Sequence, residues 1–444
     1  MKIALPAEAE KIIRILEENG FETCVVGGCV RDSLLGLTPA DWDICTAATP
    51  DEAAACLAGY RILETGLRFG AVTVVTEDGN FDVATYRFDG AYSDCRRPDQ
   101  VKFVKSLRED LARRDFTVNA MAYRPDAGLI DYFGGREDLE AKRIRAVGEA
   151  DLRFREDALR MMRALRFAAR LNFSIDPATR DSLHKNKKQL LAIAPERVSA
   201  ELGKLLTGAG ATAALREFAD VIAVVLPEIA PMCAFPQANP YHYLDVWEHT
   251  LHAVEAAPAD LTLRLALLLH DIGKPGSHCV GKDGFDHFYG HPARGAEMTE
   301  RILRRLRFPN DLTADVKELV YFHDSELAPD ISKVKRRLNR LGETQFRRLL
   351  EVRRADALAQ SARTRKKRMR QLAEIPFVLE RIFLENQCFS LRDLAVSGRD
   401  LIAAGMPEGR GIGQTLDRLL DLVIEGELEN EHAVLMDAAQ RLDK

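Results

Sequence analysis

Two aspartates, Asp41 and Asp43, follow a glycine pair and have the spacing of two metal ligands. The apolar residues 23–26 lead into Gly27-Gly28, a short helical stretch follows, and the two aspartates end the unit. Side chains at positions i and i+2 of a strand leave the same face, so both carboxylates are expected to point toward one site. Because Mg²⁺ usually takes one or two carboxylates together with substrate phosphates, the pair predicts a site for Mg²⁺ and a phosphorylated ligand.

The glycine pair and Arg31 provide the phosphate-binding part of such a site. Glycines at the start of a helix let backbone N–H groups approach a phosphate closely, and Arg31 lies one turn further along the chain. Asp82 lies on the second strand of a hairpin predicted over residues 71–86, where it is placed to supply a third carboxylate. Either motif alone is more often an ordinary turn or a solvated loop. Together, and in this order after a strand, they favour nucleotidyl transfer.

A second set of residues with ligand chemistry lies between positions 245 and 360. One histidine lies in a helical segment, a His-Asp pair follows an apolar run, and further histidines and an aspartate come later. Such ligands on separate helices suit a transition metal that keeps an open position for water. The set is His249, His270, Asp271, His291, His323 and Asp356. The other histidines are expected to be structural or surface residues: His242, His252, His278 and His287.

Composition limits the class of protein. The chain has 444 residues, 46% of them hydrophobic and 30% charged, which is typical of a globular protein with more than one domain. No apolar run reaches the roughly 18 residues of a transmembrane helix, so no membrane partner is expected. The eight cysteines show no paired spacing, and the N-terminus turns acidic before a signal-peptide core can form. These features predict a cytoplasmic protein with reduced thiols.

A net charge of −5 does not indicate nucleic-acid binding, so a polyanion would have to be bound by local basic segments. Three such segments occur, and each is about as often a solvated helix face as an RNA contact. They are residues 301–307, 333–340 and 363–370.

The order of elements divides the chain into an α/β part and a helical part. Residues 1 to about 125 alternate helix and strand, beginning with a helix over 7–19. From about residue 138 the pattern is helical almost to the end, with no further convincing sheet. A proline-rich stretch near 230–245 is typical of a linker, and a last helical unit begins near 385.

A helix predicted over residues 152–170 carries a row of charged side chains. Its apolar stripe is formed by Ala158, Met161, Met162, Leu165 and Ala169. The charged row repeats every three residues on the other side, and from this spacing alone an ordinary salt-bridged surface helix is favoured. The row consists of Asp157, Arg160, Arg163 and Arg166.

Several motifs resemble those of class II tRNA nucleotidyltransferases, the CCA-adding enzymes and their poly(A) polymerase relatives. The resemblance runs in order through about residues 20–205 and resumes within 396–430. The motifs are Gly27-Gly28-x-x-Arg31-Asp32 with Asp41-x-Asp43, Arg113-Arg-Asp-Phe-Thr-Val-Asn-Ala120, and Glu156-Asp-Ala-Leu-Arg160. Four motifs in the right order are far more specific than any one of them.

The resemblance implies roles for these residues. Asp41 and Asp43 would bind Mg²⁺ with Asp82 as a third carboxylate, and Gly28 and Arg31 would hold the triphosphate. Arg114 and Asp115 would sit at the ribose, and Asn119 would steady the site. Asp157 and Arg160 would read the incoming base, with Arg163 and Arg166 nearby. An aspartate–arginine pair offers an acceptor beside a donor fork and can therefore imitate a Watson–Crick partner for a base edge. The resemblance thus overturns the surface interpretation of the charged row.

The second set of residues resembles the ligands of an HD phosphohydrolase domain. Its four core ligands would be His249, His270, Asp271 and Asp356. His291 and His323 match the extra histidines of subgroups that hold a second metal or contact the phosphate. The resemblance implies a transition metal such as Ni²⁺, Mn²⁺, Co²⁺ or Fe²⁺, and hydrolysis of 2′,3′-cyclic phosphates or 2′-nucleotides, which some CCA-adding enzymes perform.

The expected fold class is therefore α+β, with a polymerase-β-type nucleotidyltransferase head in which helices cover a mixed sheet. The expected domains are the head over 1–137, an all-α neck over 138–230, an HD body over 240–360 and a helical tail over 361–444. The expected function is Mg²⁺-dependent addition of C, C and A, from CTP and ATP, to the 3′ end of tRNA, with the acceptor arm as the RNA partner.

Other functions remain open on the sequence. A poly(A) polymerase shares every head motif, as does an A-adding enzyme. The full-length loop over residues 86–98 argues against a CC-adding enzyme, since these tend to have this loop shortened. Outside this class, the chain could be mainly an HD nucleotide hydrolase or an inactive RNA-binding scaffold. The intact residues Asp41, Asp43, Arg114 and Asp157 argue against both.

Overall fold

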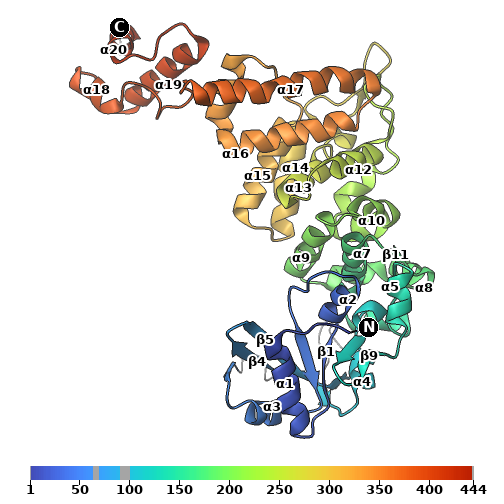
Figure 1. The fold of residues 1–444 in the computed structure, drawn as a ribbon. Coiled ribbons are helices and arrows are strands. Elements are labelled where there is room, and N and C mark those ends of the chain that lie inside the picture. Colours follow the sequence, from blue (N-terminus) through green and yellow to red (C-terminus); the bar gives the residue numbers. More distant parts are fainter. Residues whose placement is uncertain (1, 64–69, 91–100, 443–444) are drawn as a thin grey trace. The chain divides into compact units, whose positions relative to one another are not determined.

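The computed structural model describes residues 2–63, 70–90 and 101–442. The chain forms two compact units, Met1–Ala230 and Pro231–Lys444, which Figure 1 colours from blue to green and from green-yellow to red. No helix in the described ranges is both long and apolar enough to cross a membrane. The bounds of the four predicted domains stay predictions.

A seven-stranded mixed sheet is the centre of the first unit, with strand order β3-β4-β5-β2-β1-β8-β9. β2 and β5 are parallel neighbours, and the other neighbours are antiparallel. The strands are Thr23–Val26 (β1), Asp43–Thr46 (β2), Arg61–Leu63 (β3), Ala71–Thr76 (β4), Gly79–Thr85 (β5), Met121–Arg124 (β8) and Gly128–Asp131 (β9). This sheet and its helices confirm the predicted α+β fold class.

Local sequence accounts for the first elements. The helix predicted over 7–19 is α1, Ala7–Glu18, and its buried residues recur at helical spacing: Ala9, Ile12, Ile13 and Leu16. The hairpin predicted over residues 71–86 is β4–β5, and its turn is tight because Thr76 pairs with Gly79. Only Glu77 and Asp78 lie between these paired residues.

The chain turns sharply between β1 and α2 (Gly28–Leu34). Gly27 has a φ of +82°, and a Cβ there would lie 3.0 Å from Arg114 Nη1. Glycine is therefore required both by the backbone conformation and by the close approach of the arginine. Further along the chain, β6 (Arg87–Asp89) pairs with β7 (Val101–Phe103). Most of the loop predicted over 86–98 lies outside the described residues.

The helix predicted over 152–170 is interrupted, and that prediction is wrong in this respect. α6 (Ala150–Glu156) ends at Asp157, whose φ of −139° and ψ of 103° are extended. α7 (Leu159–Leu171) begins two residues later, and the Leu159 N–H donates to Asp157 Oδ1 at 3.0 Å. An aspartate that accepts from a nearby backbone N–H competes with helix formation and starts a new helix instead.

The apolar stripe of α7 is buried as predicted, but the opposite side is not a solvated surface. Arg160 and Arg166 are buried too, since other elements pack around the helix.

The first unit also contains a small parallel sheet, the two-stranded pair β10–β11, which was not predicted from the sequence. It corrects the expectation that no further sheet follows residue 138. The remaining elements of the unit include these two strands. They are Pro50–Cys56 (α3), Leu107–Ala112 (α4), Thr117–Asn119 (η2), Gly135–Glu140 (α5), Arg143–Ile144 (β10), Ser174–Ile175 (β11), Pro177–Asn186 (α8), Lys187–Ala192 (η3), Pro195–Leu206 (α9), Ala211–Glu217 (α10) and Ala219–Val225 (α11).

The second unit is helical apart from one small hairpin. Its main helices after η4 (Pro227–Met232) are Val246–Ala256 (α12), Leu261–Leu269 (α13), His291–Arg305 (α14), Asn310–Phe322 (α15), Ile331–Leu358 (α16) and Ala362–Leu384 (α17). Between α13 and α14 lie Pro275–Ser277 (η5), Cys279–Val280 (β12) and Asp286–His287 (β13). α12, α13, α15 and α16 contact one another, which brings the ends of separate helices together.

The last three helices have a hydrophobic core of their own. They are Gly398–Ala403 (α18), Arg410–Glu425 (α19) and His432–Leu442 (α20). Leu401, Leu419 and Leu435, one from each helix, are buried in this core.

Candidate functional sites

A cavity of about 530 Å³ opens in the first unit beside the β1–α2 turn. All of the predicted head residues line it except Asp82. The predicted residues in its wall are Gly28, Arg31, Asp41, Asp43, Arg114, Asp115, Asn119, Asp157, Arg160, Arg163 and Arg166. The structure thus brings together residues that are far apart in the sequence, while their individual roles remain predictions.

The three carboxylates lie at the ends of neighbouring strands. Asp43 is the first residue of β2, Asp41 precedes the strand, and parallel pairing sets Asp43 opposite Asp82. Partial removal of water raises the pKa of Asp43; Arg114 opposes this shift, and repulsion by Asp82 and Asp41 adds to it. Thr73 Oγ1 donates to Asp82 Oδ1 at 2.6 Å. Carboxylates that repel one another in this way fit the binding of a divalent cation.

A chain of polar contacts crosses the floor of this cavity. Arg31 Nη1 donates to Asn119 Oδ1 at 2.5 Å, and Asn119 Nδ2 donates to Asp115 Oδ1 at 3.1 Å. Arg163 Nε donates to Asp115 Oδ2 at 2.7 Å. Burial alone would raise the pKa of Asp115, but Arg163 and Asn119 hold it below its usual value. Asp115 is therefore an ionised anchor that fixes two cavity arginines, Arg163 directly and Arg31 through Asn119.

Arg114 is fixed at the turn by a buried carboxylate. Its Nη2 donates to Asp110 Oδ2 at 3.3 Å, and Asp110 Oδ1 accepts from Arg113 Nη2 at 2.7 Å. Burial would lower the pKa of Arg114, but Asp110 raises it above its ordinary value. Arg114 thus remains charged and directed at Gly27, where a phosphate is expected to bind.

The residues expected to read the base are held by partners of their own. Arg197 Nη2 donates to Asp157 Oδ2 at 3.0 Å. Arg160 Nη1 donates to Glu156 Oε2 at 2.6 Å, and its Nη2 donates to the backbone oxygen of Arg113 at 2.9 Å. These contacts remove rotational freedom from both side chains before any ligand binds.

Sequence reasoning missed several residues of this wall. Arg197 and Phe167 line the cavity, and Glu201 pairs with Arg166 at 2.9 Å. Phe167 also lies under the Arg166 guanidinium, 4.0 Å from its ring centroid. Arg197 and Glu201 are four residues apart on α9, and this spacing could have predicted that both side chains lie on one face of the helix. Phe167 carried no such signal, since an aromatic residue in a buried helix is usually core.

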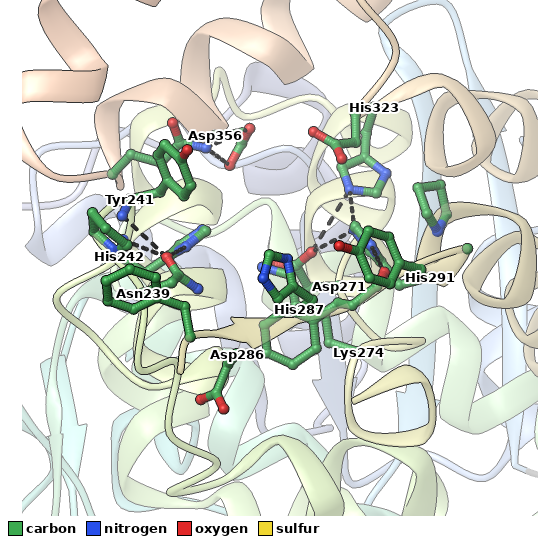
Figure 2. A pocket seen from close by; sticks show the side chains of 18 of the residues that line it. Asn239, Tyr241, His242, Asp271, Lys274, Asp286, His287, His291, His323 and Asp356 are labelled. Carbon is green, nitrogen blue, oxygen red and sulfur yellow. Dashed lines mark hydrogen bonds and ion pairs between the residues drawn. The ribbon is translucent and has the colours of Figure 1, made fainter. Parts of the chain in front are cut away.

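A second cluster lies where α12, α13, α14, α15 and α16 meet in the other unit. Among the described residues there are two groups of three potential metal ligands, and they share Asp271. Within each group, the ligand atoms all lie within 4.8 Å of one another. One group adds His249 and His270, and the other adds His291 and His323. Figure 2 shows Asp271 joined to His291 and His323 by dashed lines. The three carboxylates of the head do not form so compact a group.

Each histidine of the cluster is oriented by its own backbone contact. Nδ1 lies near a carbonyl oxygen in every case: Ala359 for His249 (3.3 Å), Leu267 for His270 (2.7 Å), Phe288 for His291 (2.8 Å) and Val320 for His323 (2.7 Å). With Nδ1 as the donor, every Nε2 carries a lone pair.

The inward-facing nitrogens meet in pairs. His249 Nε2 lies 3.3 Å from His270 Nε2, and His291 Nε2 lies 3.2 Å from His323 Nε2. Two lone pairs cannot form a hydrogen bond with each other, so each pair of neutral imidazoles needs a cation, either a proton or a metal ion, between its two Nε2 atoms. Burial would lower the pKa of the His270 imidazole, but Asp271 raises it, so a proton is retained there until a metal replaces it. The donor set therefore fits one metal on each side of Asp271, with neutral imidazole as the main ligand type.

Two aspartates and two cations complete the cluster. His249 Nε2 lies 3.1 Å from Asp356 Oδ1, although Asp356 belongs to neither compact group. Lys274 Nζ lies 2.7 Å from Asp271 Oδ2, and Arg368 Nη1 lies 3.4 Å from Asp356 Oδ2. Burial would raise the pKa of both carboxyl groups. His270 and Lys274 hold the pKa of Asp271 well below its usual value, and His249, His270 and Arg353 do the same for Asp356. Both aspartates are therefore ionised, as metal ligands would have to be.

A cavity of about 490 Å³ gives access to this cluster. Asp271, His291 and His323 line it, whereas His249 and His270 are absent from its wall and fully buried. His242 and His287, expected to be structural or surface residues, also line it. Burial and the nearby Lys274 lower the pKa of His242 to about 3, so its imidazole is neutral. No sequence motif marks His242 and His287 as cavity residues, because a turn and a short hairpin bring them to the cavity.

Three family models match successive parts of the chain. A poly A polymerase head domain matches residues 23–145, an RNA and SrmB-binding site of polymerase A matches 172–233, and tRNA nucleotidyltransferase domain 2 matches 294–439. CCA-adding enzymes from Limosilactobacillus reuteri and Geobacillus thermodenitrificans are 34% and 36% identical to this chain, over 100% and 98% of both sequences.

Solved structures of the same kind share the fold. The CCA-adding enzyme of Bacillus stearothermophilus in complex with CTP has a TM-score of 0.73 and 30% identity, and the match covers 98% of both chains. The Thermotoga maritima CCA-adding enzyme complexed with tRNA has a TM-score of 0.62 over 99% of this chain and 96% of that one. Its 20% identity supports the fold alone.

Proposed function

The chain belongs to the family of CCA-adding enzymes and is a tRNA nucleotidyltransferase, and from this premise we propose that it adds C, C and A to the 3′ end of tRNA from CTP and ATP. The observation that carries the proposal is the head cavity, which gathers carboxylates, phosphate-binding arginines and an aspartate–arginine pair. The related Bacillus enzyme in complex with CTP supports a nucleoside triphosphate as the ligand.

We propose that the reaction is an in-line displacement. The 3′-hydroxyl of the RNA attacks the α-phosphorus, the bond to the bridging oxygen breaks, and pyrophosphate leaves. Asp41 and Asp43, with Asp82 opposite, would hold Mg²⁺, whose chemistry is to neutralise charge on the attacking and leaving oxygens. Gly28 and Arg31 would bind the triphosphate, and Arg114 would lie at the ribose. Both arginines are already fixed by protein partners and therefore lose little freedom on binding.

We propose that Asp157 and Arg160 select the base. Cytosine and adenine both present an exocyclic amine donor beside a ring-nitrogen acceptor, so one acceptor–donor pair can accept both. Uracil and guanine place a carbonyl and an N–H there and would leave the protein groups unpaired. The contacts from Arg197 and Glu156 support this role because they fix the direction of both side chains.

The RNA partner is expected to be the tRNA acceptor arm. Its phosphates would be bound by basic segments such as 363–370, because the net charge of −5 gives no general attraction. Shape rather than base sequence would guide this contact, as is usual for double-stranded RNA. Since tRNA and nucleoside triphosphates are cytoplasmic molecules, we propose a cytoplasmic location.

One assay tests the main proposal. Purified protein is incubated with tRNA that lacks its 3′ end and with CTP and ATP, singly and together, and products are resolved to one nucleotide. The expected product carries three added nucleotides and forms only with both triphosphates. A long tail from ATP alone would identify a poly(A) polymerase, and addition only to tRNA already ending in CC would identify an A-adding enzyme.

A second activity is favoured by the paired histidine–aspartate cluster, and we propose that this unit is an HD-type metal-dependent phosphohydrolase. His249, His270, Asp271 and Asp356 would hold a transition metal such as Ni²⁺, Mn²⁺, Co²⁺ or Fe²⁺, and His291 and His323 would hold a second one at Asp271. The metal would activate water for attack on phosphorus. Lys274 and Arg368 would neutralise the phosphate oxygens, since both cations line the same cavity.

A further inference from the structure

Three large aromatic side chains lie exposed in the wall of the histidine–aspartate cavity. Tyr289 is 74% exposed, Tyr241 57% and Phe285 42%. They come from three places in the sequence: the turn before α14, the segment before α12 and the β12–β13 hairpin. Aromatic rings usually bury much of their area, so three open rings in one wall form a surface suited to a flat ligand.

The most exposed of the three rings is supported from behind. The Tyr289 and His287 rings are stacked, with centroids 5.1 Å apart and planes 7° from parallel. His287 Nε2 lies 3.1 Å from both carboxylate oxygens of Asp283. A Cβ at Gly281 would lie 2.6 Å from the His287 ring, so glycine lets this ring lie directly against the hairpin. The tyrosine is therefore held in place before a ligand arrives.

Tyr289 lies two residues before a histidine of the cluster in the sequence. Tyr289 is followed by Gly290, whose φ is +73°, and then by His291, the first residue of α14 and a member of one compact group. Lys274 and Arg368 lie in the same cavity. Cations and metal ligands thus meet exposed aromatic rings within one space of about 490 Å³.

We propose that Tyr289 and Tyr241, with Phe285, form a nucleobase-binding subsite, so that this cavity takes a phosphorylated nucleoside. The base would stack on the tyrosines while the phosphate lies at Lys274 and Arg368. Stacking on aromatic side chains is the usual way that proteins hold an unpaired base of any sequence. The inference rests on the proposed phosphohydrolase function of the same cavity and adds the residues that would hold the base of its ligand. The nucleoside is either a free nucleotide or the last nucleotide of an RNA strand.

Calorimetric binding to the metal-loaded full chain tests the subsite. The probes are adenosine 3′-phosphate and glycerol 2-phosphate, which shares the phosphate ester but has no ring. The wild type is expected to prefer the adenosine probe, and Tyr289→Ala to weaken its binding about ten-fold. Tyr289→Phe should bind as the wild type does, because the ring is kept. Binding of glycerol 2-phosphate should be the same in all variants.

Tyr243→Ala is the matched control. Tyr243 is 62% exposed, similar to Tyr241, but it does not line the cavity. The proposal is overturned if the two probes bind equally well to the wild type, or if Tyr243→Ala weakens adenosine 3′-phosphate binding as much as Tyr289→Ala does. Near-ultraviolet circular dichroism of each variant checks that the fold is intact.

Parallel hydrolysis assays separate this inference from the function on which it rests. Metal-dependent hydrolysis of both probes without any base preference would refute the subsite and leave the phosphohydrolase standing. Base-selective binding without hydrolysis of either probe would refute the phosphohydrolase and leave the subsite standing. The last probe is an oligoribonucleotide with a 3′-phosphate. If it binds more tightly than the mononucleotide, and Tyr289→Ala removes this gain in affinity, the ligand is an RNA end. If the two bind equally well, the ligand is a free nucleotide.

Discussion

Charged groups are arranged differently in the head cavity and in the histidine–aspartate cluster. In the head, most charged groups are paired within the protein, as Asp115 is with Arg163 and Asp157 with Arg197. The carboxylates expected to bind Mg²⁺ are exposed and repel one another. In the cluster, the histidines and aspartates are buried. The histidines are oriented by backbone carbonyls, and their Nε2 atoms face one another in pairs.

This difference indicates different relations to the metal. An exposed pair of carboxylates leaves coordination positions open, which suits Mg²⁺ that arrives and departs with the phosphates of the substrate. Buried imidazoles with lone pairs in contact are costly without a cation, which suits a metal that stays with the protein and stabilises its fold. The head is thus prepared for a substrate–metal complex, and the cluster for a resident metal.

The largest effect is expected from the head carboxylates. Asp43→Ala should reduce kcat for nucleotide addition to less than about a tenth of the wild type, a barrier increase of more than roughly 1.4 kcal/mol. Asp41→Ala should do the same. Single-turnover addition of CMP to tRNA measures the effect. Asp78→Ala, in the exposed β4–β5 turn, is the control and should leave addition unchanged. Retention of more than a tenth of kcat in either variant would show that the metal binds elsewhere.

Loss of the resident metal should affect only the second unit. The double variant His270→Ala/Asp271→Ala should lose metal-dependent phosphohydrolase activity and bound transition metal, measured by elemental analysis, while nucleotide addition survives. Some thermal stability should be lost, because the metal joins several helices. His252→Ala, on α12 but outside both compact groups, should keep the metal. A folded double variant with unchanged phosphatase activity would refute the assignment, and loss of addition would refute the independence of the two sites.

A smaller effect is expected on nucleotide choice. Asp157→Ala and Arg160→Ala should lower the preference for C over U and A over G, by about 1–3 kcal/mol per lost contact pair. Arg197→Ala should have a weaker effect of the same kind, because it frees Asp157 without removing it. Ratios of kcat/KM for each triphosphate measure the preference, with the exposed Arg136→Ala as control. Unchanged ratios in the first two variants would leave α7 as a structural helix.

Residues in local motifs were predictable, and their distant partners were not. Asp41 and Asp43 are two residues apart at the start of β2, so spacing and chemistry were enough to pair them. Asp157 and Arg197 are 40 residues apart, and no local sequence pattern predicts a contact between them. The break at Asp157 was missed because helical periodicity continues through it, whereas a single side-chain hydrogen bond interrupts the helix.

The same contrast holds in the second unit. The histidines and aspartates of the cluster were predicted from residue type and resemblance, but their pairing through Nε2 depends on four backbone carbonyls that no sequence pattern specifies. Tyr289 and His287 reach the cavity through a hairpin too short to give a periodic signal. Tertiary contacts, rather than propensities, therefore decide which polar residues become part of a site.

The smallest effect is expected from the raised pKa of Asp43. The pKa of Asp43 is raised in the folded protein, chiefly by partial desolvation, so its ionised form costs stability. The cost is absent below the unfolded pKa of about 3.9 and reaches its full size once the pH exceeds the raised folded value. Asp43→Asn should therefore raise the free energy of unfolding at pH 7 by less than about 1 kcal/mol, since solvent screens an exposed carboxylate.

Calorimetric melting of Asp43→Asn and the wild type at several pH values, without metal, measures this difference. It should vanish at low pH, where Asp43 is protonated, and Mg²⁺ should reverse its sign at pH 7 by stabilising only the wild type. The buried cluster gives the opposite expectation, because removing Asp271 should lower stability. A variant of Asp43 that is less stable than the metal-free wild type at pH 7 would show that this carboxylate is paired like Asp115, and the contrast between an open head site and a buried resident site would no longer hold.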